Sequence, residues 1–171
     1  MPETDGTTMI DGPITRWTSA PTRHLQVRGE SFAYRDLGVD SGRPPIVLLA
    51  HLGATLDEWD PRVVEALAEG RRVIAVDLPG IGSSTGNVPR TIKGMAGAAR
   101  AFISELGLTR IDLMGFSLGG FVAQQVTLDA PELVRRLVLA GTGPAGGRGD
   151  RPAHRSRLRL PRHAARSARP H

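Results

Sequence analysis

Short apolar runs alternate with helix-like patterns through the middle of the chain. Continuous apolar runs predict strands over 46–50, 72–76, 111–114 and 137–140. A strand that is buried on both faces of a parallel sheet is apolar at every position, so we expect these four strands to be buried. Strands that alternate with amphipathic helices predict an α/β fold with a mostly parallel sheet flanked by helices.

Capping signals set the expected helix boundaries. Asp60 is a plausible N-cap because Pro61 follows it at the first helical position. Thr91 is the expected N-cap of a second helix that runs to about Leu106. A third helix should begin just after residue 117 and stop near Pro131. The three helices therefore fall between the predicted strands.

The pattern also divides the chain into segments. We expect a flexible N-terminus over 1–21, then a folded core over 22–147 that opens with a β-hairpin (strands over 24–29 and 31–36). Residues 148–171 form an arginine-rich segment with few apolar side chains. Such a segment cannot bury enough surface to offset its ordering entropy, so we expect it to be disordered.

The net charge of +5 is unevenly distributed. Residues 148–171 contain eight arginines and one aspartate, a local charge of +7, which leaves the rest of the chain at −2. A mildly acidic body is not typical of a nucleic-acid-binding protein, so we expect no nucleic-acid partner. The alternative is that the arginine-rich segment alone binds nucleic acid or an anionic membrane.

Cysteine is absent, which excludes disulfides and thiolate metal sites. The chain contains no apolar run of the roughly 20 residues needed to span a bilayer. Its first 20 residues lack the basic start and apolar centre of a signal peptide. We therefore expect a cytoplasmic protein that does not associate with a membrane.

The strand over 111–114 leads into a Gly-x-Ser-x-Gly sequence centred on Ser117. A serine on a tight strand-to-helix turn adopts a strained backbone, and Gly115 and Gly119 relieve the crowding on either side. The following helix would place the hydroxyl near backbone amides that stabilise negative charge. Ser117 is therefore a candidate nucleophile. The alternative is a glycine-rich turn with an incidental serine.

Four motifs occur in an order that resembles the α/β-hydrolase fold superfamily, of the AB hydrolase-1 type. They are His-Leu-Gly at 51–53, Asp-Leu-Pro-Gly-Ile-Gly-Ser-Ser at 77–84, the serine turn at 115–120 and Gly-Thr-Gly at 141–143. The resemblance covers roughly 22–147, about the N-terminal half of a typical member. It implies an α/β-hydrolase fold that is truncated after the strand following the nucleophile elbow.

The resemblance also implies roles for particular residues. Ser117 matches the nucleophile, and the amide of Leu118 matches one donor of the oxyanion hole. The second donor lies in the loop after the first buried strand, where Leu52 and Gly53 are both candidates. His51 matches a histidine that shapes this loop. No metal or organic cofactor is implied.

The catalytic acid and the general base stay unassigned. The superfamily places them after the nucleophile, in the order serine, acid, histidine. Asp129 and Glu132 precede the next strand, on the wrong side of the elbow. Asp150 with His154 has the right order, but a disordered segment cannot hold two groups in catalytic geometry.

These features imply a serine hydrolase that acts on an ester or similar acyl bond of a small molecule through an acyl-Ser117 intermediate. We expect its activity to be impaired, since the acid and base are unassigned. One alternative is an inactive fragment, truncated or frameshifted, or a pseudoenzyme. Another is a member similar to the cofactor-free haloperoxidases. The substrate and the oligomeric state are left open.

Overall fold

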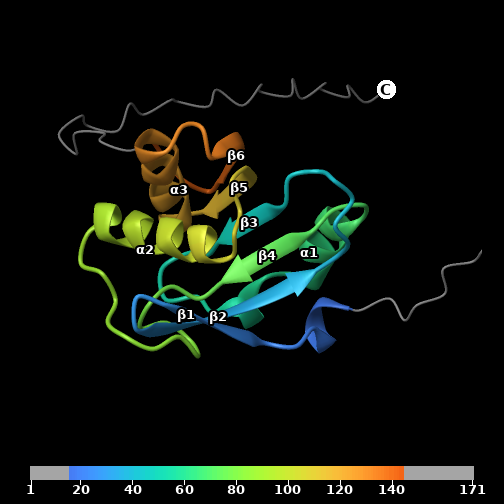
Figure 1. Ribbon diagram of the computed structural model, residues 1–171, viewed down its shortest axis with the longest axis horizontal. Helices are drawn as coiled ribbons and strands as arrows, with labels where there is room; N and C mark the ends of the chain where they lie inside the picture. Colours follow the sequence, from blue (N-terminus) through green and yellow to red (C-terminus); the bar gives the residue numbers. More distant parts are fainter. Residues whose placement is uncertain (1–15, 145–171) are drawn as a thin grey trace, which may run out of the picture.

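A computed structural model describes residues 16–144 of the chain (Figure 1). The disorder predicted for residues 148–171 falls outside these residues. In chain order the elements are η1 (Trp17–Ser19), β1 (Arg23–Val27), β2 (Glu30–Leu37), β3 (Ile46–Leu49), η2 (Leu56–Glu58), α1 (Pro61–Ala68), β4 (Val73–Val76), α2 (Ile92–Glu105), β5 (Ile111–Phe116), α3 (Leu118–Asp129) and β6 (Val134–Ala140).

The strands form one six-stranded sheet in the order β1-β2-β4-β3-β5-β6. The pairs β3–β4, β3–β5 and β5–β6 are parallel, whereas the β1–β2 hairpin joins β4 in antiparallel fashion. Val47 lies at the centre, in register with Ile74 on one side and Leu113 on the other. The predicted α/β class with a mostly parallel sheet is therefore confirmed.

Helices cover both faces of the sheet. α2 and α3 pack side by side on one face, and α1 packs on the other (Figure 1). Side chains alternate between the two faces of a strand, so Val47 and Leu49 of β3 belong to the cluster under α2 and α3, and Ile46 and Leu48 belong to the cluster under α1. This two-sided burial explains why β3 is apolar at every position.

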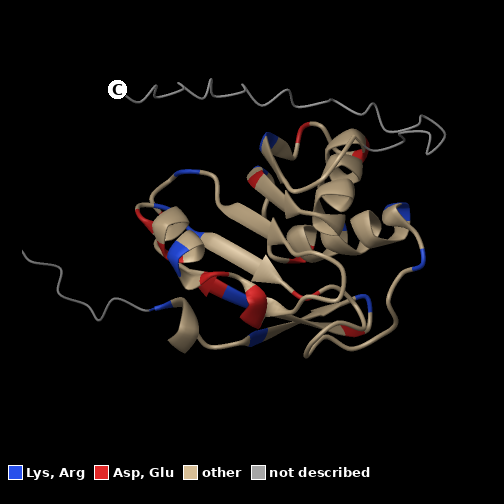
Figure 2. Ribbon diagram, turned by 180° about the vertical axis from the view of Figure 1, so that it is seen from behind, with Lys and Arg blue, Asp and Glu red and all other residues tan. Residues whose placement is uncertain are grey.

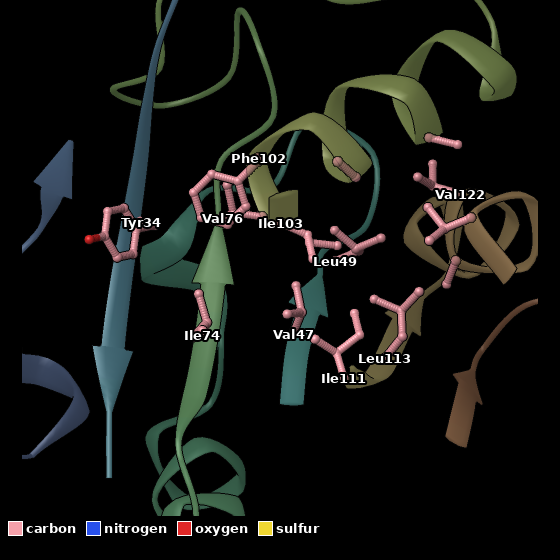
Figure 3. Close-up of a cluster of buried hydrophobic side chains, with 14 of the residues drawn as sticks. Tyr34, Val47, Leu49, Ile74, Val76, Phe102, Ile103, Ile111, Leu113 and Val122 are labelled. Carbon is pink, nitrogen blue, oxygen red and sulfur yellow. The ribbon is translucent and has the colours of Figure 1, made fainter. Parts of the chain in front are cut away.

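The larger of the two cores lies beneath α2. Figure 3 shows Phe102 of α2 beside the sheet, where its ring stacks on Phe32 at 5.8 Å between centroids and meets the Tyr34 ring edge-on at 5.5 Å. Val122 extends the same cluster to α3. The helix that begins at the serine turn is thereby fixed against the central strands.

The predicted helix starts are present. The Asp60 carboxylate accepts from the Arg62 amide at 2.9 Å, with Pro61 at the first helical position. The Thr91 hydroxyl accepts from the Gly94 amide at 3.0 Å. Both caps satisfy amides that the helix itself leaves unpaired.

The N-terminal segment differs from the prediction of a flexible stretch over 1–21. Trp17 is 1% exposed and Ala20 is 6% exposed, and both belong to the core under α1. The Trp17 amide donates to the Glu65 carboxylate of α1 at 2.9 Å. The prediction was wrong at residues 17–20 because an isolated tryptophan in a polar stretch shows no periodicity that would reveal its burial.

The last strand also differs from the prediction. β6 begins at Val134 rather than at 137, and it lies at an edge of the sheet with β5 as its neighbour. Val138 is 45% exposed and Leu139 is 43% exposed, so the expected burial of this strand is wrong. Because an apolar run looks the same in a central strand and in a strand that is covered on one side only, the sequence pattern could not separate the two.

Charged residues are confined mainly to loops, helix ends and the ends of the sheet. The central strands β3 and β4 carry none (Figure 2). Asp112, at the start of β5, is a buried charged residue that is 3% exposed. It accepts from Arg71 at 2.6 Å and from the Nε and Nη2 of Arg135 at 2.9 and 2.7 Å. Burial raises the pKa of Asp112, but the bonds from the two arginines outweigh this effect and hold it below its usual value.

Within residues 16–144, the helices are too short or too polar to cross a lipid bilayer.

Candidate active site

Ser117 occupies a sharp turn between β5 and α3. Its backbone angles are φ 52° and ψ −114°, a conformation that a residue with a side chain rarely adopts. The Ser117 amide donates to the Ala140 carbonyl of β6 at 2.9 Å, and its carbonyl accepts from the Gly120 amide at 2.9 Å. The strained turn is therefore anchored both to the neighbouring strand and to the first turn of α3.

The two glycines of the motif allow this turn to close. A Cβ atom on Gly115 would lie 2.6 Å from the Cα of Gly120 and would collide with the Gly119 carbonyl. A Cβ atom on Gly119 would lie 2.6 Å from the carbonyl carbon of Leu49 in β3. Since real Cβ atoms do not approach so closely, α3 could not sit this near to β3 and β5 with larger residues at either position.

A third glycine follows the motif, and it was not predicted to matter. A Cβ atom on Gly120 would lie 2.6 Å from the Cβ of Thr142, in the segment after β6. The Gln124 amide nitrogen donates to the Gly143 carbonyl at 2.8 Å and to the Gly120 carbonyl at 3.2 Å. These contacts tie the segment after β6 to α3 beside Ser117. The second glycine of the Gly119–Gly120 pair could have indicated this close contact from the sequence. No feature of the sequence indicates the role of Gln124.

The residues predicted for the oxyanion hole line one small cavity. Leu118 and Gly119 of α3 line a cavity of about 50 Å³, and Leu52 and Gly53 of the loop after β3 line the same cavity. Gly53 has a φ of 73°, which allows the loop after β3 to turn here. The structure thus brings all three candidate donor residues to the same place. Their roles, and the choice between Leu52 and Gly53, stay predictions.

His51 shapes the loop beside this cavity. Its Nδ1 lies 3.2 Å from the Leu52 carbonyl, and its Nε2 lies 3.2 Å from a Glu58 carboxylate oxygen. The ring also packs edge-on against Phe116, with 5.5 Å between the centroids. Both ring nitrogens therefore have partners other than Ser117, an arrangement that orients the loop.

A second, larger cavity shares Ala50, His51 and Ala54 of the loop after β3 with the first. It has a volume of about 290 Å³, and its lining includes His51, Trp59, Met114 and Phe116. The two residues that flank Ser117 in sequence line different cavities, Phe116 the larger and Leu118 the smaller.

Asp77 holds two loops of the site together. Its buried carboxylate accepts from the Leu56 amide at 2.9 Å and from the Ser83 amide at 3.4 Å. Burial raises the pKa of Asp77, while these two amides act against that rise. Because the carboxylate is surrounded by backbone donors, the geometry gives it a structural position.

The described part of the chain places no general base beside Ser117. Its two histidines are His51 and His24, and the latter lies on β1, at the opposite end of the sheet, where Nδ1 is 3.3 Å from the Ser31 hydroxyl. Asp129 accepts from Gln125 at the far end of α3. Asp150 and His154 fall outside the described residues, so the acid and base stay unassigned. Within residues 16–144, acidic and histidine side chains do not gather in a group that could hold a metal ion.

A mostly parallel sheet with a strained serine between a central strand and a helix defines the α/β-hydrolase class. A family model described as "alpha/beta hydrolase fold" matches residues 44–161. The chain therefore belongs to the α/β-hydrolase fold family.

Several known proteins are similar to this chain over part of their length. A poly(3-hydroxyalkanoate) depolymerase from Ectopseudomonas oleovorans is 37% identical over 108 residues, which cover 61% of this chain and 38% of the relative. A 2-hydroxy-6-oxononadienedioate/2-hydroxy-6-oxononatrienedioate hydrolase from a Pseudomonas species is 32% identical over 70% of this chain and 44% of its own.

Among solved structures, an alpha/beta hydrolase fold protein from Chitinophaga pinensis superposes with a TM-score of 0.74 at 37% identity. The match covers 75% of this chain and 46% of that chain. The present chain thus spans less than half the length of each of these three proteins.

Proposed function

We propose that Ser117 is the nucleophile of a serine hydrolase that acts on an ester or similar acyl bond of a small molecule. The observation that supports this most strongly is the backbone of Ser117, at φ 52° and ψ −114° between two glycines that cannot be larger. A strained residue persists only where the surrounding structure enforces it, and such strain is concentrated at functional sites. The family membership of the chain agrees with this proposal.

In the proposed reaction, the Ser117 hydroxyl oxygen attacks the acyl carbon and the carbonyl oxygen becomes an oxyanion. The Leu118 amide and one amide from Leu52 or Gly53 would stabilise that charge, and each such donor is typically worth about 3 kcal/mol. The bond from the tetrahedral carbon to the leaving oxygen then breaks, and that oxygen takes up the proton that the Ser117 hydroxyl gave up and departs as the alcohol. Water then hydrolyses the acyl-Ser117 that remains.

Both steps need a base to accept a proton. Residues 16–144 place no histidine beside Ser117, so we propose that the chain acylates slowly and that its turnover is impaired. Serine hydrolases that lack part of their triad retain some catalysis from the oxyanion donors and from binding alone.

Labelling with a fluorophosphonate probe tests this proposal. We expect slow, stoichiometric labelling of the 171-residue chain that Ser117→Ala abolishes. Ser83→Ala is the matched control, since Ser83 is exposed in a neighbouring loop and should leave labelling unchanged. Mass spectrometry of the labelled peptide identifies the modified residue. Labelling that survives Ser117→Ala, or no labelling of a folded chain, would overturn the proposal.

A non-catalytic relative is the second candidate function. The observation that favours it is that both ring nitrogens of His51 are engaged and that His24 lies on β1, far from the elbow. Such a protein would keep the two cavities and bind small molecules without acylation. Binding of an ester analogue that is equally tight in the Ser117→Ala variant, together with absent labelling, would favour this function over the first.

A further inference from the structure

A short turn after β3 carries the two residues that compete for the role of second oxyanion donor. The Ala54 amide donates to the His51 carbonyl at 3.2 Å, which closes the turn around Leu52 and Gly53. Among residues 16–144, the amides of Leu52 and Gly53 have no acceptor. Leu52 is 73% exposed, so packing does little to fix the turn. The direction of these amides therefore depends on what holds the two ends of the turn.

The Glu58 carboxylate contacts both ends of this turn. One of its oxygens accepts from the Thr55 amide at 3.4 Å, and the other lies 3.2 Å from Nε2 of His51. A carboxylate only accepts, so the second contact is a hydrogen bond whenever Nε2 carries a hydrogen, as it does in one neutral tautomer and in the protonated ring. Leu52 and Gly53 thus lie between two points that a single side chain holds.

Glu58 is itself attached to a fixed part of the molecule. It belongs to η2, where its own amide donates to the Thr55 carbonyl at 3.2 Å. Leu56, the first residue of η2, is 4% exposed, and its amide donates to the buried Asp77 carboxylate at 2.9 Å. The Glu58 side chain therefore reaches from an anchored element back to a more exposed turn.

His51 connects this contact to the serine turn. Its ring packs edge-on against Phe116, the residue before the candidate nucleophile, and it lines both cavities of the site. Two carboxylates, those of Glu58 and Asp60, line the larger cavity with it. Asp60 is engaged by Arg62 at 2.6 Å. Glu58 is thus the carboxylate that is placed to hold the ring.

We propose that Glu58 is a positioning residue, which acts through His51 to hold the turn at residues 52–53 with an amide directed at the oxyanion. This role rests on the proposed function, since it concerns a loop whose amide would bind the oxyanion formed at Ser117. The side chains of His51 and Glu58 are 37% and 50% exposed, and an ion pair at such a site contributes little to stability. Loss of Glu58 should therefore weaken the reaction of Ser117 much more than it weakens the fold.

The rate of fluorophosphonate labelling at Ser117 tests this role. We expect Glu58→Ala to lower the maximal rate about tenfold, since a displaced donor should cost less than the outright loss of one, which costs about a hundredfold or more. The probe concentration that gives half of the maximal rate should stay within about twofold, because an oxyanion donor acts on charge that develops only in the transition state. A higher half-maximal concentration at an unchanged maximal rate would show a role in binding instead, and the proposal would be wrong.

Asp57→Ala is the matched control. Asp57 is the neighbouring residue of η2, and its carboxylate binds Arg35 at 2.6 Å. This variant should be labelled as fast as the unsubstituted chain. Glu58→Gln keeps an acceptor oxygen and should restore part of the rate that Glu58→Ala loses. Equal slowing by Asp57→Ala and Glu58→Ala would show a general loosening of η2 and would rule out a specific role of Glu58.

A double-mutant cycle with His51→Ala tests whether Glu58 acts through the ring. Most of the effect of Glu58→Ala on the labelling rate should disappear when His51 is already replaced, because residues that act through one another are not independent. Effects of the two substitutions that simply multiply would contradict the proposal. Circular dichroism confirms that each variant is folded.

The backbone amide resonance of Gly53 gives a readout that does not depend on labelling. We expect one sharp resonance in the unsubstituted chain and in Asp57→Ala, and a broadened or doubled one in Glu58→Ala, because the released turn samples more than one orientation. If Ser117 of the unsubstituted chain is not labelled, the proposed function alone is wrong, and the Gly53 resonance still decides whether Glu58 holds the turn. An unchanged Gly53 resonance in Glu58→Ala would overturn the proposal.

Discussion

Backbone strain at individual residues separates the serine turn from the other turns of the molecule. Ser117 and Arg28 are the non-glycine residues with positive φ among residues 16–144. Arg28 lies in the hairpin turn between β1 and β2, where a two-residue connection requires such angles. Ser117 has no such requirement from a hairpin, and its conformation follows from the close packing of Gly115 and Gly119. A strained conformation of this type costs about 1–3 kcal/mol.

We predict that Ser117→Gly stabilises the fold relative to Ser117→Ala. Both changes remove the hydroxyl, but only glycine adopts positive φ without strain, so the difference should be about 1 kcal/mol in the free energy of unfolding. Chemical denaturation measures it. As a control, the pair Ser104→Gly and Ser104→Ala in α2 should show the opposite order, because glycine weakens a helix. The same order at both positions would contradict the strain at Ser117.

At the scale of elements, the Asp112 side chain links β5 to β6 and to the loop before β4, which are distant in sequence. Its carboxylate receives Arg71, which precedes β4, and Arg135 of β6, while its own backbone is part of β5. These strands carry the serine turn and the segment that anchors it. The ion-pair cluster thus lies at the opposite end of β5 from Ser117 and fixes the strand that leads to it.

We predict that Asp112→Asn lowers the free energy of unfolding by about 2 kcal/mol at neutral pH, since two arginines lose a buried partner. The pKa of Asp112 is lowered in the folded chain. Its contribution is therefore complete above the unfolded value of about 3.9 and is lost as the pH falls through the folded value. Denaturation at pH 7 and at pH 3 should show the difference between the two proteins shrinking at the lower pH. Asp40→Asn, in an exposed loop, is the control. A difference that stays constant with pH would contradict this assignment.

At the scale of the whole molecule, the start of the described chain closes one face of the sheet. Trp17 is fully buried under α1, and the Arg35 guanidinium lies 5.3 Å from the centre of its ring. The Trp17 backbone amide donates a hydrogen bond to the Glu65 carboxylate. The segment before the hairpin therefore belongs to the core that supports β3, β4 and the larger cavity.

We predict that Trp17→Ala lowers the free energy of unfolding by about 3 kcal/mol, because a large buried side chain leaves a cavity that the surroundings fill only in part. The neighbouring Thr18→Ala, at an exposed position, should change it by less than about 0.5 kcal/mol. Urea denaturation followed by circular dichroism compares the two variants. Equal stability of both would show that the segment does not contribute to the core.

The sequence by itself determined the elements and the chemistry that depends on local pattern. The apolar runs at 46–50 and 72–76, the caps at Asp60 and Thr91, and the glycines around Ser117 each carry a signal within a few residues. Propensity, capping and turn geometry are local, so these features can be read without knowledge of the fold.

Tertiary structure alone decided the features that join distant segments. It placed Trp17 in the core, set β6 at an edge of the sheet that residues 16–144 form, bound Asp112 to two arginines, and brought Leu52, Gly53 and Leu118 to one cavity. Burial and pairing depend on which segments meet in space, and an apolar strand at an edge has the same local pattern as a central one. The physical reason is that long-range contacts fix the position of a residue, whereas the sequence pattern fixes only its preference.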